Sequence, residues 1–202
     1  MSKRVITISR EFGSGGRTIG RMVAEALGVP FYDKKLIAMV AEESGFSLDF
    51  VEESGENYTT SLLFNLAMGS VYGHNAYAAE NIPPTDRVNI LQSRIIKEIA
   101  QKEPCVIVGR SADYILRERD DCFNVFVHAR MDKKLERAVN DYGISQKDAE
   151  KEIQHRDRAR ATHYRHYTGR VWGMSMNYHL TLDSGAFSIE ACRDIIVDLA
   201  KR

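Results

Sequence analysis

Residues 9–18 read Ser-Arg-Glu-Phe-Gly-Ser-Gly-Gly-Arg-Thr, and this glycine-rich stretch decides how the rest of the chain is interpreted. The preceding residues 5–8 are apolar or β-branched and predict a short buried strand. Residues 16–27 carry apolar side chains at helical spacing and predict an amphipathic helix. A strand, a glycine-rich turn and a helix can form a phosphate cradle, because the glycines permit a tight turn and the helix N-terminus supplies N–H donors.

The stretch departs from the Walker A pattern G-x-x-x-x-G-K-[ST]. Arg10 stands in place of the first glycine and Gly16 in place of the lysine, and Arg17 follows. A glycine-rich turn by itself is also typical of a simple strand-to-helix connection. We expect phosphate binding here, with Thr18 placed to offer its hydroxyl to a magnesium ion. The candidate phosphate-binding residues are Gly13, Ser14, Gly15, Gly16, Arg17 and Thr18.

Composition narrows the class of protein. The chain has 202 residues, of which 44% are hydrophobic and 28% charged, as is typical of one globular domain with a hydrophobic core. A formal net charge of zero argues against a generally basic nucleic-acid-binding protein. Cys105, Cys122 and Cys192 form no C-x-x-C pair and predict buried thiols rather than a zinc site or disulfide framework. We find no signal peptide and no apolar run of about 18 residues, and therefore expect a cytoplasmic protein without a membrane span.

Strand-like and helix-like segments alternate along the chain. The expected strands are residues 3–8, 30–33, 105–108, 123–127 and 178–182. The expected helices are residues 16–27, 34–44, 86–102, 110–117, 131–142 and 145–162, with a last helix around residues 189–199 and a short one that Ser47 would cap. This alternation predicts a three-layer α/β fold with a parallel sheet, in a single domain over residues 1–202. Residues 105–108 are apolar throughout and predict a strand buried on both faces.

Residues 34–102 are interpreted as a helical insert that binds the acceptor, followed by a core helix. We expect Asp86 to cap that core helix, and Gln92 and Arg94 to lie away from its apolar face. Residues 55–85 combine an apolar cluster at 62–66 with an irregular stretch, which predicts an insert over the sheet edge that holds a substrate. The apolar cluster packs either on the core or on a second subunit, so a homodimer stays open.

Residues 155–172 contain five arginines and three histidines, with Asp157 as the one acid. A charge run is commonly a solvated helix face, but here no acids alternate with the bases and the chain as a whole is neutral. Arg156 and Arg160 lie one helical turn apart and share a face. Arginine recognises phosphate oxygens through paired N–H donors, so we interpret this segment as an arginine-rich lid. No carboxylate or cysteine completes a metal site with the histidines.

A phosphate cradle and a separate arginine segment are the parts that phosphoryl transfer requires. At this point the chain resembles the cytidylate kinase-like group of the nucleoside monophosphate kinases. The resemblance covers nearly the whole chain and rests on residues 8–17, 30–33, 106–110, 167–173 and 182–184. It implies a P-loop fold with a five-stranded parallel sheet, and ATP-dependent phosphorylation of CMP or dCMP with magnesium.

The resemblance also implies roles for single residues. Residues 13–18 would hold the phosphates of ATP, while Ser184 and Gly185 would lie near the adenine. Arg156 and Arg160 would be lid arginines that act in catalysis.

Four further residues are candidates by position. Arg17 is a candidate for supplying the charge of the missing lysine. Asp33, at the end of the second expected strand, is a candidate for orienting the acceptor or the magnesium shell, or is simply a helix cap. Arg94 and Arg110 are candidates for holding the acceptor, with a buried structural ion pair as the less favoured alternative for Arg110.

The chain departs from true cytidylate kinases at informative positions. The loop lysine is absent, Val108 stands where an aspartate precedes Gly-Arg, and Ser111 stands where an acid follows it. Two alternatives to a small-molecule kinase therefore stay open. One is a nucleotide-binding regulator without turnover. The other, favoured less because the chain is neutral, is a nucleic-acid-binding protein that uses residues 155–172.

Overall fold

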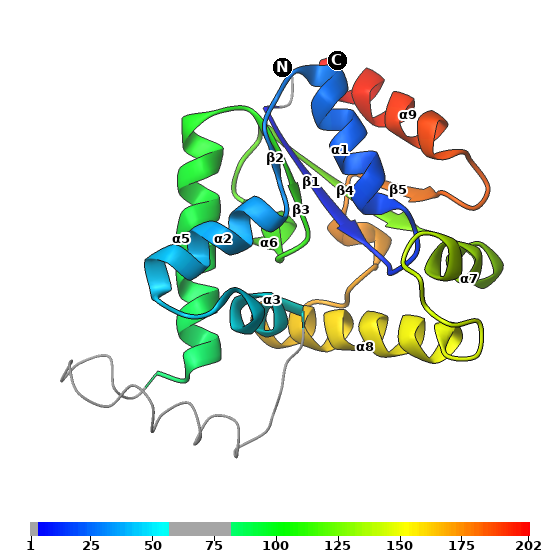
Figure 1. Cartoon of the computed structure of the whole chain (residues 1–202). Helices are drawn as coiled ribbons and strands as arrows, with labels where there is room; N and C mark the ends of the chain where they lie inside the picture. Colours follow the sequence, from blue (N-terminus) through cyan, green and yellow to red (C-terminus); the bar gives the residue numbers. More distant parts are fainter. Residues whose placement is uncertain (1–3, 57–81) are drawn as a thin grey trace.

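The computed structural model describes residues 4–56 and 82–202. Five parallel strands form one sheet in the order β2-β3-β1-β4-β5. The strands are β1 Val5–Arg10, β2 Phe31–Tyr32, β3 Cys105–Val108, β4 Cys122–His128 and β5 Leu180–Asp183. The glycine-rich stretch therefore follows the central strand, which pairs with β3 on one side and with β4 on the other (Figure 1). The predicted parallel α/β architecture is confirmed.

Helices cover both faces of the sheet. They are α1 Gly16–Leu27, α2 Lys34–Ser44, α3 Leu48–Glu56, α5 Pro84–Lys102, α6 Ala112–Ile115, α7 Met131–Asn140, α8 Ala149–Thr168 and α9 Ile189–Lys201. Helices α1 and α9 lie on one face, and α2, α5 and α6 on the other. Helix α8 crosses the end of the sheet toward which the strand arrows point (Figure 1). The result is three layers, with α8 beyond the carboxyl ends of the strands, where parallel sheets place ligands.

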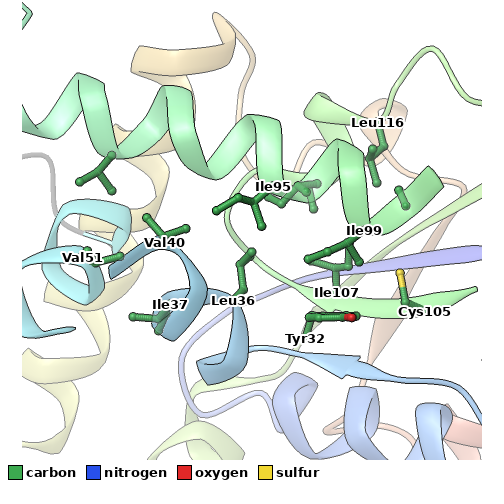
Figure 2. Packing of buried hydrophobic residues seen from close by; sticks show 14 of the residues in the cluster. Tyr32, Leu36, Ile37, Val40, Val51, Ile95, Ile99, Cys105, Ile107 and Leu116 are labelled. Atoms are coloured by element: carbon green, nitrogen blue, oxygen red, sulfur yellow. The ribbon is translucent and has the colours of Figure 1, made fainter. Parts of the chain in front are cut away.

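The core forms because side chains alternate between the faces of the central strands. Val5 and Ile107 point to the layer of α2, α3 and α5, whereas Ile6 and Val106 point to the layer of α1 and α9. Figure 2 shows the first of these layers, where side chains of α2 and α5 such as Leu36 pack over β3. Burying one such side chain contributes about 1.5–3 kcal/mol.

A third, smaller cluster places the glycine-rich loop. Phe12 is buried with Ala138 of α7 and with Ala149 and Ile153 of α8. The loop after β1 is thereby packed against two helices that come much later in the chain.

Helix α8 is longer than its predicted extent. The Asp148 N–H donates to Ser145 Oγ at 3.3 Å in the turn before the helix, which begins at Ala149 rather than at residue 145 and continues past residue 162 to Thr168. It ends at Gly169, whose φ of 69° is a left-handed conformation that favours glycine. The aromatic and histidine residues before Gly169 are therefore helical.

Three predicted details of the helices are wrong. Helix α5 begins at Pro84, so Asp86 lies within its first turn instead of capping it; proline suits that position because the first N–H groups of a helix need no partner. Gln92 is 2% exposed and lies on the buried face of α5. In α9, the helical spacing from Ile189 to Leu199 predicts that Leu199 faces the core, but Leu199 is 38% exposed and Ala200 is buried instead. Most of the predicted insert at 55–85, including the cluster at 62–66, lies outside the described residues.

Candidate functional site

A polar cleft opens at the carboxyl ends of β1, β2 and β3. Of the described residues that line it, six are basic and three are acidic. The lining residues are Arg10, Glu11, Phe12, Gly13, Gly15, Gly16, Arg17, Asp33, Lys34, Ile37, Glu52, Arg110, Tyr142, Arg156 and Arg160. The cleft thus joins the glycine-rich loop with the arginine segment of α8, and its excess of positive charge suits an anion.

The loop presents backbone donors to this cleft. Gly13 and Gly15 have φ values of 73° and 75°, and α1 begins directly after them at Gly16. Within the described chain, the N–H groups of Gly15, Arg17 and Thr18 meet no acceptor. Unpartnered N–H groups at the start of a twelve-residue helix form a site for phosphate, because the helix dipole adds to their partial charge.

Two predicted phosphate-binding side chains do not line the cleft. The Ser14 side chain is buried, and its hydroxyl donates to the Glu11 carbonyl at 2.8 Å while accepting from the Gly16 N–H at 3.3 Å. Thr18 is exposed in the first turn of α1. The Ser14 hydroxyl shapes the loop from within, and the position of Thr18 gives no support to its predicted magnesium contact.

The structure joins two of the predicted catalytic residues. Arg17 Nε lies 2.5 Å from Asp33 Oδ2, and both side chains line the cleft. Asp33 follows β2 and precedes α2, so the ion pair connects the start of α1 with the neighbouring strand end. The guanidinium of Arg17 is therefore engaged by a carboxylate.

Arg156 and Arg160 gather over one ring of the loop. Their guanidinium carbons lie 4.6 and 5.8 Å from the centre of the Phe12 ring, which is buried beneath them. Arg156 also pairs with Glu152 at 2.6 Å, and Arg160 Nη1 donates to the Arg10 carbonyl at 3.4 Å. Stacking on an aromatic face holds an arginine in place while leaving its N–H edge available to an anion.

A buried lysine connects the loop with α8. Lys134 of α7 is 5% exposed, and its Nζ lies 3.0 Å from Glu11 Oε2 and 2.6 Å from Asp157 Oδ2. Asp157 also accepts from the Phe12 N–H at 2.6 Å. This network fixes the position of Phe12, and so that of the two arginines that stack on it. A lone lysine in a polar helix gives no sign of it in the sequence.

Arg110 lies in the cleft wall and is held by α3. Its Nη1 donates to the Val51 carbonyl at 3.0 Å and its Nη2 to the Glu52 carbonyl at 3.4 Å. Its backbone φ of 59° is left-handed, which is rare for a residue with a side chain. The structural role weighed for Arg110 is thus present, beside its place in the cleft. Arg94 does not line the cleft; it is half-exposed and pairs with Glu43 and Glu98, so an acceptor role for it has no support.

A second, smaller pocket shares Arg10, Arg110 and Arg160 with the cleft and forms its deeper end, because its other lining residues are mostly buried. Ser9, Gly109, Ser111, His163, Tyr164 and Trp172 contribute to it together with Arg10, Arg110 and Arg160. Beside it, the buried Asp113 accepts from Ser9 Oγ at 3.2 Å and from Tyr164 Oη at 2.6 Å. Burial raises the pKa of Asp113, although these two donors oppose that shift. Burial likewise raises the pKa of Tyr164.

Ser184 connects β5 with the loop. Its Oγ donates to the Ser14 carbonyl at 2.5 Å and accepts from Arg137 Nη1 at 3.0 Å. The same Arg137 atom donates to the Gly13 carbonyl at 3.2 Å. Ser184 is 2% exposed, so its side chain contributes to the loop's support, and Arg137 is a supporting residue that sequence reasoning missed.

The profile of the cytidylate kinase-like family matches residues 5–186. The chain belongs to the cytidylate kinase-like family. Among curated proteins, no sequence is found to match it. The predicted family is therefore confirmed.

Solved structures resemble this cytidylate kinase-like chain over nearly its whole length. An uncharacterized protein from Eubacterium ventriosum is 24% identical, with a TM-score of 0.72 and 97% of each chain covered. Shikimate kinase from Acinetobacter baumannii, in complex with shikimate, is 14% identical with a TM-score of 0.54, covering 97% of this chain and 92% of that one. Shikimate kinase from Bacteroides thetaiotaomicron is 17% identical with a TM-score of 0.55 and 98% of each chain covered. These likenesses show the P-loop kinase fold.

Metal and membrane features complete the description of this cytidylate kinase-like chain. Within residues 4–56 and 82–202, no three His, Cys, Asp or Glu side chains group to hold a metal ion. No helix in that same part of the chain is long and apolar enough to cross a membrane.

Proposed function

We propose that this protein is an ATP-dependent phosphotransferase that moves the γ-phosphoryl group to a nucleoside monophosphate or a similarly small acceptor. One observation carries the proposal. The unpartnered N–H groups at the start of α1 and the arginines of α8 line the same cleft. Phosphoryl transfer requires positioning of the phosphates and cancellation of their charge, and this cleft supplies donors for both.

The residues divide between the two substrates. The loop N–H groups would hold the phosphates of ATP. Arg156 and Arg160, stacked on Phe12, would meet the transferring phosphoryl group from the opposite side. The acceptor would enter the deeper end of the cleft, with Asp33 beside the path between the two substrates.

Magnesium fits this cleft as a companion of ATP rather than as a resident ion, because the described side chains offer no cluster for it. When bound, it would neutralise charge on the β- and γ-phosphates. Asp33 is the carboxylate we propose for its outer shell, in preference to the exposed Thr18.

CMP and dCMP are the first acceptors to test, because the family carries their name. Uncharged residues stand at Val108 and Ser111, where true cytidylate kinases have acids, so hydroxylated small molecules outside the nucleotides belong in the same test.

The experiment measures ADP release from magnesium-ATP in a coupled assay. The panel contains nucleoside monophosphates, nucleosides and hydroxylated small acids. We expect turnover that depends on one class of acceptor. Tight ATP binding without acceptor-dependent turnover would contradict the proposal and favour a nucleotide-binding regulator. Salt-sensitive binding of oligonucleotides that ATP does not displace would favour a nucleic-acid-binding protein.

A further inference from the structure

Arg10 occupies the space that a loop lysine would need. It is the last residue of β1 and lines both the outer and the deeper part of the cleft. Its side chain runs beneath the start of α1 toward the end of β3, where its guanidinium lies against Gly109. It therefore brings a positive charge to the point where the two parts of the cleft meet.

The two glycines beside Arg10 are explained by this path. A Cβ added to Gly16 would lie 2.5 Å from Arg10 Cβ and 3.2 Å from Arg10 Cγ. A Cβ added to Gly109 would lie 3.1 Å from Arg10 Cζ and closer still to Nη1. A side chain at position 16 would therefore collide with the base of Arg10, whereas one at position 109 would require the end of the Arg10 side chain to move. The two departures from the Walker A pattern, arginine for glycine at 10 and glycine for lysine at 16, therefore depend on each other, because the Arg10 side chain fills the space beside Gly16.

The other basic residues at the loop have different partners. Arg17 is paired with Asp33, and Arg110 donates to carbonyls of α3. Arg156 is paired with Glu152. Arg10 differs from them in position, because it ends β1 and its side chain passes between Gly16 and Gly109.

We propose that Arg10 supplies, from the end of β1, the positive charge that lysine supplies in a Walker A loop, and so contacts the β- and γ-phosphates of the bound nucleotide. This inference rests on the proposed function. Arginine suits the role because its planar guanidinium can contact two phosphate oxygens at once.

The test removes the Arg10 side chain and then restores the Walker A residues, glycine at position 10 and lysine at position 16. Dissociation constants for ATP and AMP are measured by calorimetry, because AMP lacks the β- and γ-phosphates. We expect Arg10→Ala to weaken ATP binding about 10- to 100-fold, the range for loss of a charged hydrogen bond, with little change for AMP. Arg4→Ala, an exposed arginine at the opposite end of β1, is the matched control and should leave both constants unchanged.

The exchange variant R10G/G16K should regain most of the ATP affinity. Without Arg10, the nearest neighbour of a Cβ at position 16 is Val127 Cβ at 3.3 Å, which a small shift accommodates. Gly16→Lys alone should not bind ATP better than the wild type, because Arg10 still fills the space. Arg17→Ala should weaken ATP binding less than Arg10→Ala, since the proposal places the phosphate contact on Arg10.

Two results would overturn the inference: Arg10→Ala with wild-type ATP affinity, or an equal loss for ATP and AMP. An exchange variant no better than Arg10→Gly would overturn it as well. If thermal melting shows Arg10→Ala to be unfolded, Arg10→Gln takes its place in the same comparison. A wild-type chain that binds ATP but turns over no acceptor would refute the proposed function and leave the Arg10 measurements decisive on their own.

Discussion

At the scale of single residues, the ion pair between Arg17 and Asp33 joins two side chains that the sequence had indicated as catalytic candidates. The Asp33 side chain is 14% exposed, and Arg17 Nε lies 2.5 Å from its carboxylate. The carboxylate also lines the cleft, where it can accept a hydrogen bond from an acceptor's hydroxyl.

We predict that Asp33→Asn lowers kcat about 100-fold, because an amide cannot take the acceptor's proton as a carboxylate does. ATP affinity should change by less than about threefold, since loop N–H groups hold the phosphates. Steady-state kinetics and calorimetry measure the two quantities. Asp49→Asn, an exposed aspartate on α3, is the matched control. Unchanged kcat in Asp33→Asn would show that Asp33 serves only to fix Arg17.

Helix α8 is the element that decides the shape of the cleft. Hydrogen bonds spread along its length attach it to the rest of the chain, among them those of Asp157 with the Phe12 N–H, of Tyr164 with Asp113, and of Tyr167 Oη with Asp86 at 2.8 Å. The segment predicted as a lid is therefore a wall held along its length in this structure. Its arginines are placed in advance of any ligand.

Two arginines on α8 provide a matched pair. Arg156 lines the cleft, whereas Arg158 is exposed two residues on, outside it. Arg156→Ala should lower kcat about tenfold or more with a smaller loss of ATP affinity, because charge over the transferring group acts mainly on the transition state. Arg158→Ala should leave both unchanged. Equal losses of kcat and affinity in Arg156→Ala would indicate simple ground-state binding.

The ion pairs of Lys134 connect α7 with α8 and with the loop, and we expect them to stabilise the fold. We predict that Lys134→Met destabilises the fold by about 3–5 kcal/mol, because the change leaves Glu11 and Asp157 without their buried partner. Urea unfolding measures the difference. Lys151→Met makes the same change at an exposed position on α8 and should stay within about 0.5 kcal/mol of the wild type. Similar stabilities for the two variants would show that the buried network contributes little.

At the scale of the whole molecule, Asp113 joins three elements that lie far apart in the sequence. It lies on α6, accepts from Ser9 of β1 and from Tyr164 of α8, and is 2% exposed. Burial raises its pKa above the usual 3.8, so the carboxyl holds its proton more readily in the folded chain than in the unfolded one. Its contribution to stability is fully present below the unfolded pKa and is lost as pH rises through the folded pKa.

The raised pKa of Asp113 gives a prediction for how the stability of the fold depends on pH. The free energy of unfolding of the wild type minus that of Asp113→Asn should fall as pH rises above 3.8. Urea unfolding of both proteins between about pH 4 and pH 8 measures that difference, and groups common to both cancel. A constant difference would mean that the Ser9 and Tyr164 donors offset burial, and a difference that rises with pH would mean that they outweigh it.

The sequence by itself determined the sheet, the glycine-rich loop and the family, because these depend on local patterns. Apolar runs such as Cys105–Val108 predict buried strands, and glycines at 13 and 15 allow a tight turn wherever the chain later packs. The closeness of Arg17 and Asp33 could also have been predicted, because each residue follows a strand and the carboxyl ends of parallel strands meet at one edge of the sheet.

Only the tertiary structure decided which charges act together. Lys134, Arg137 and Asp113 reach the loop or the cleft from far along the chain, and no spacing in the sequence marks them. Arg94 and Thr18 are suitable residue types, but neither of them lines the cleft. The missing lysine shows the difference most clearly. In the sequence it is a defect, whereas in the fold Arg10 fills the space that a side chain at Gly16 would need, because two side chains cannot occupy one volume.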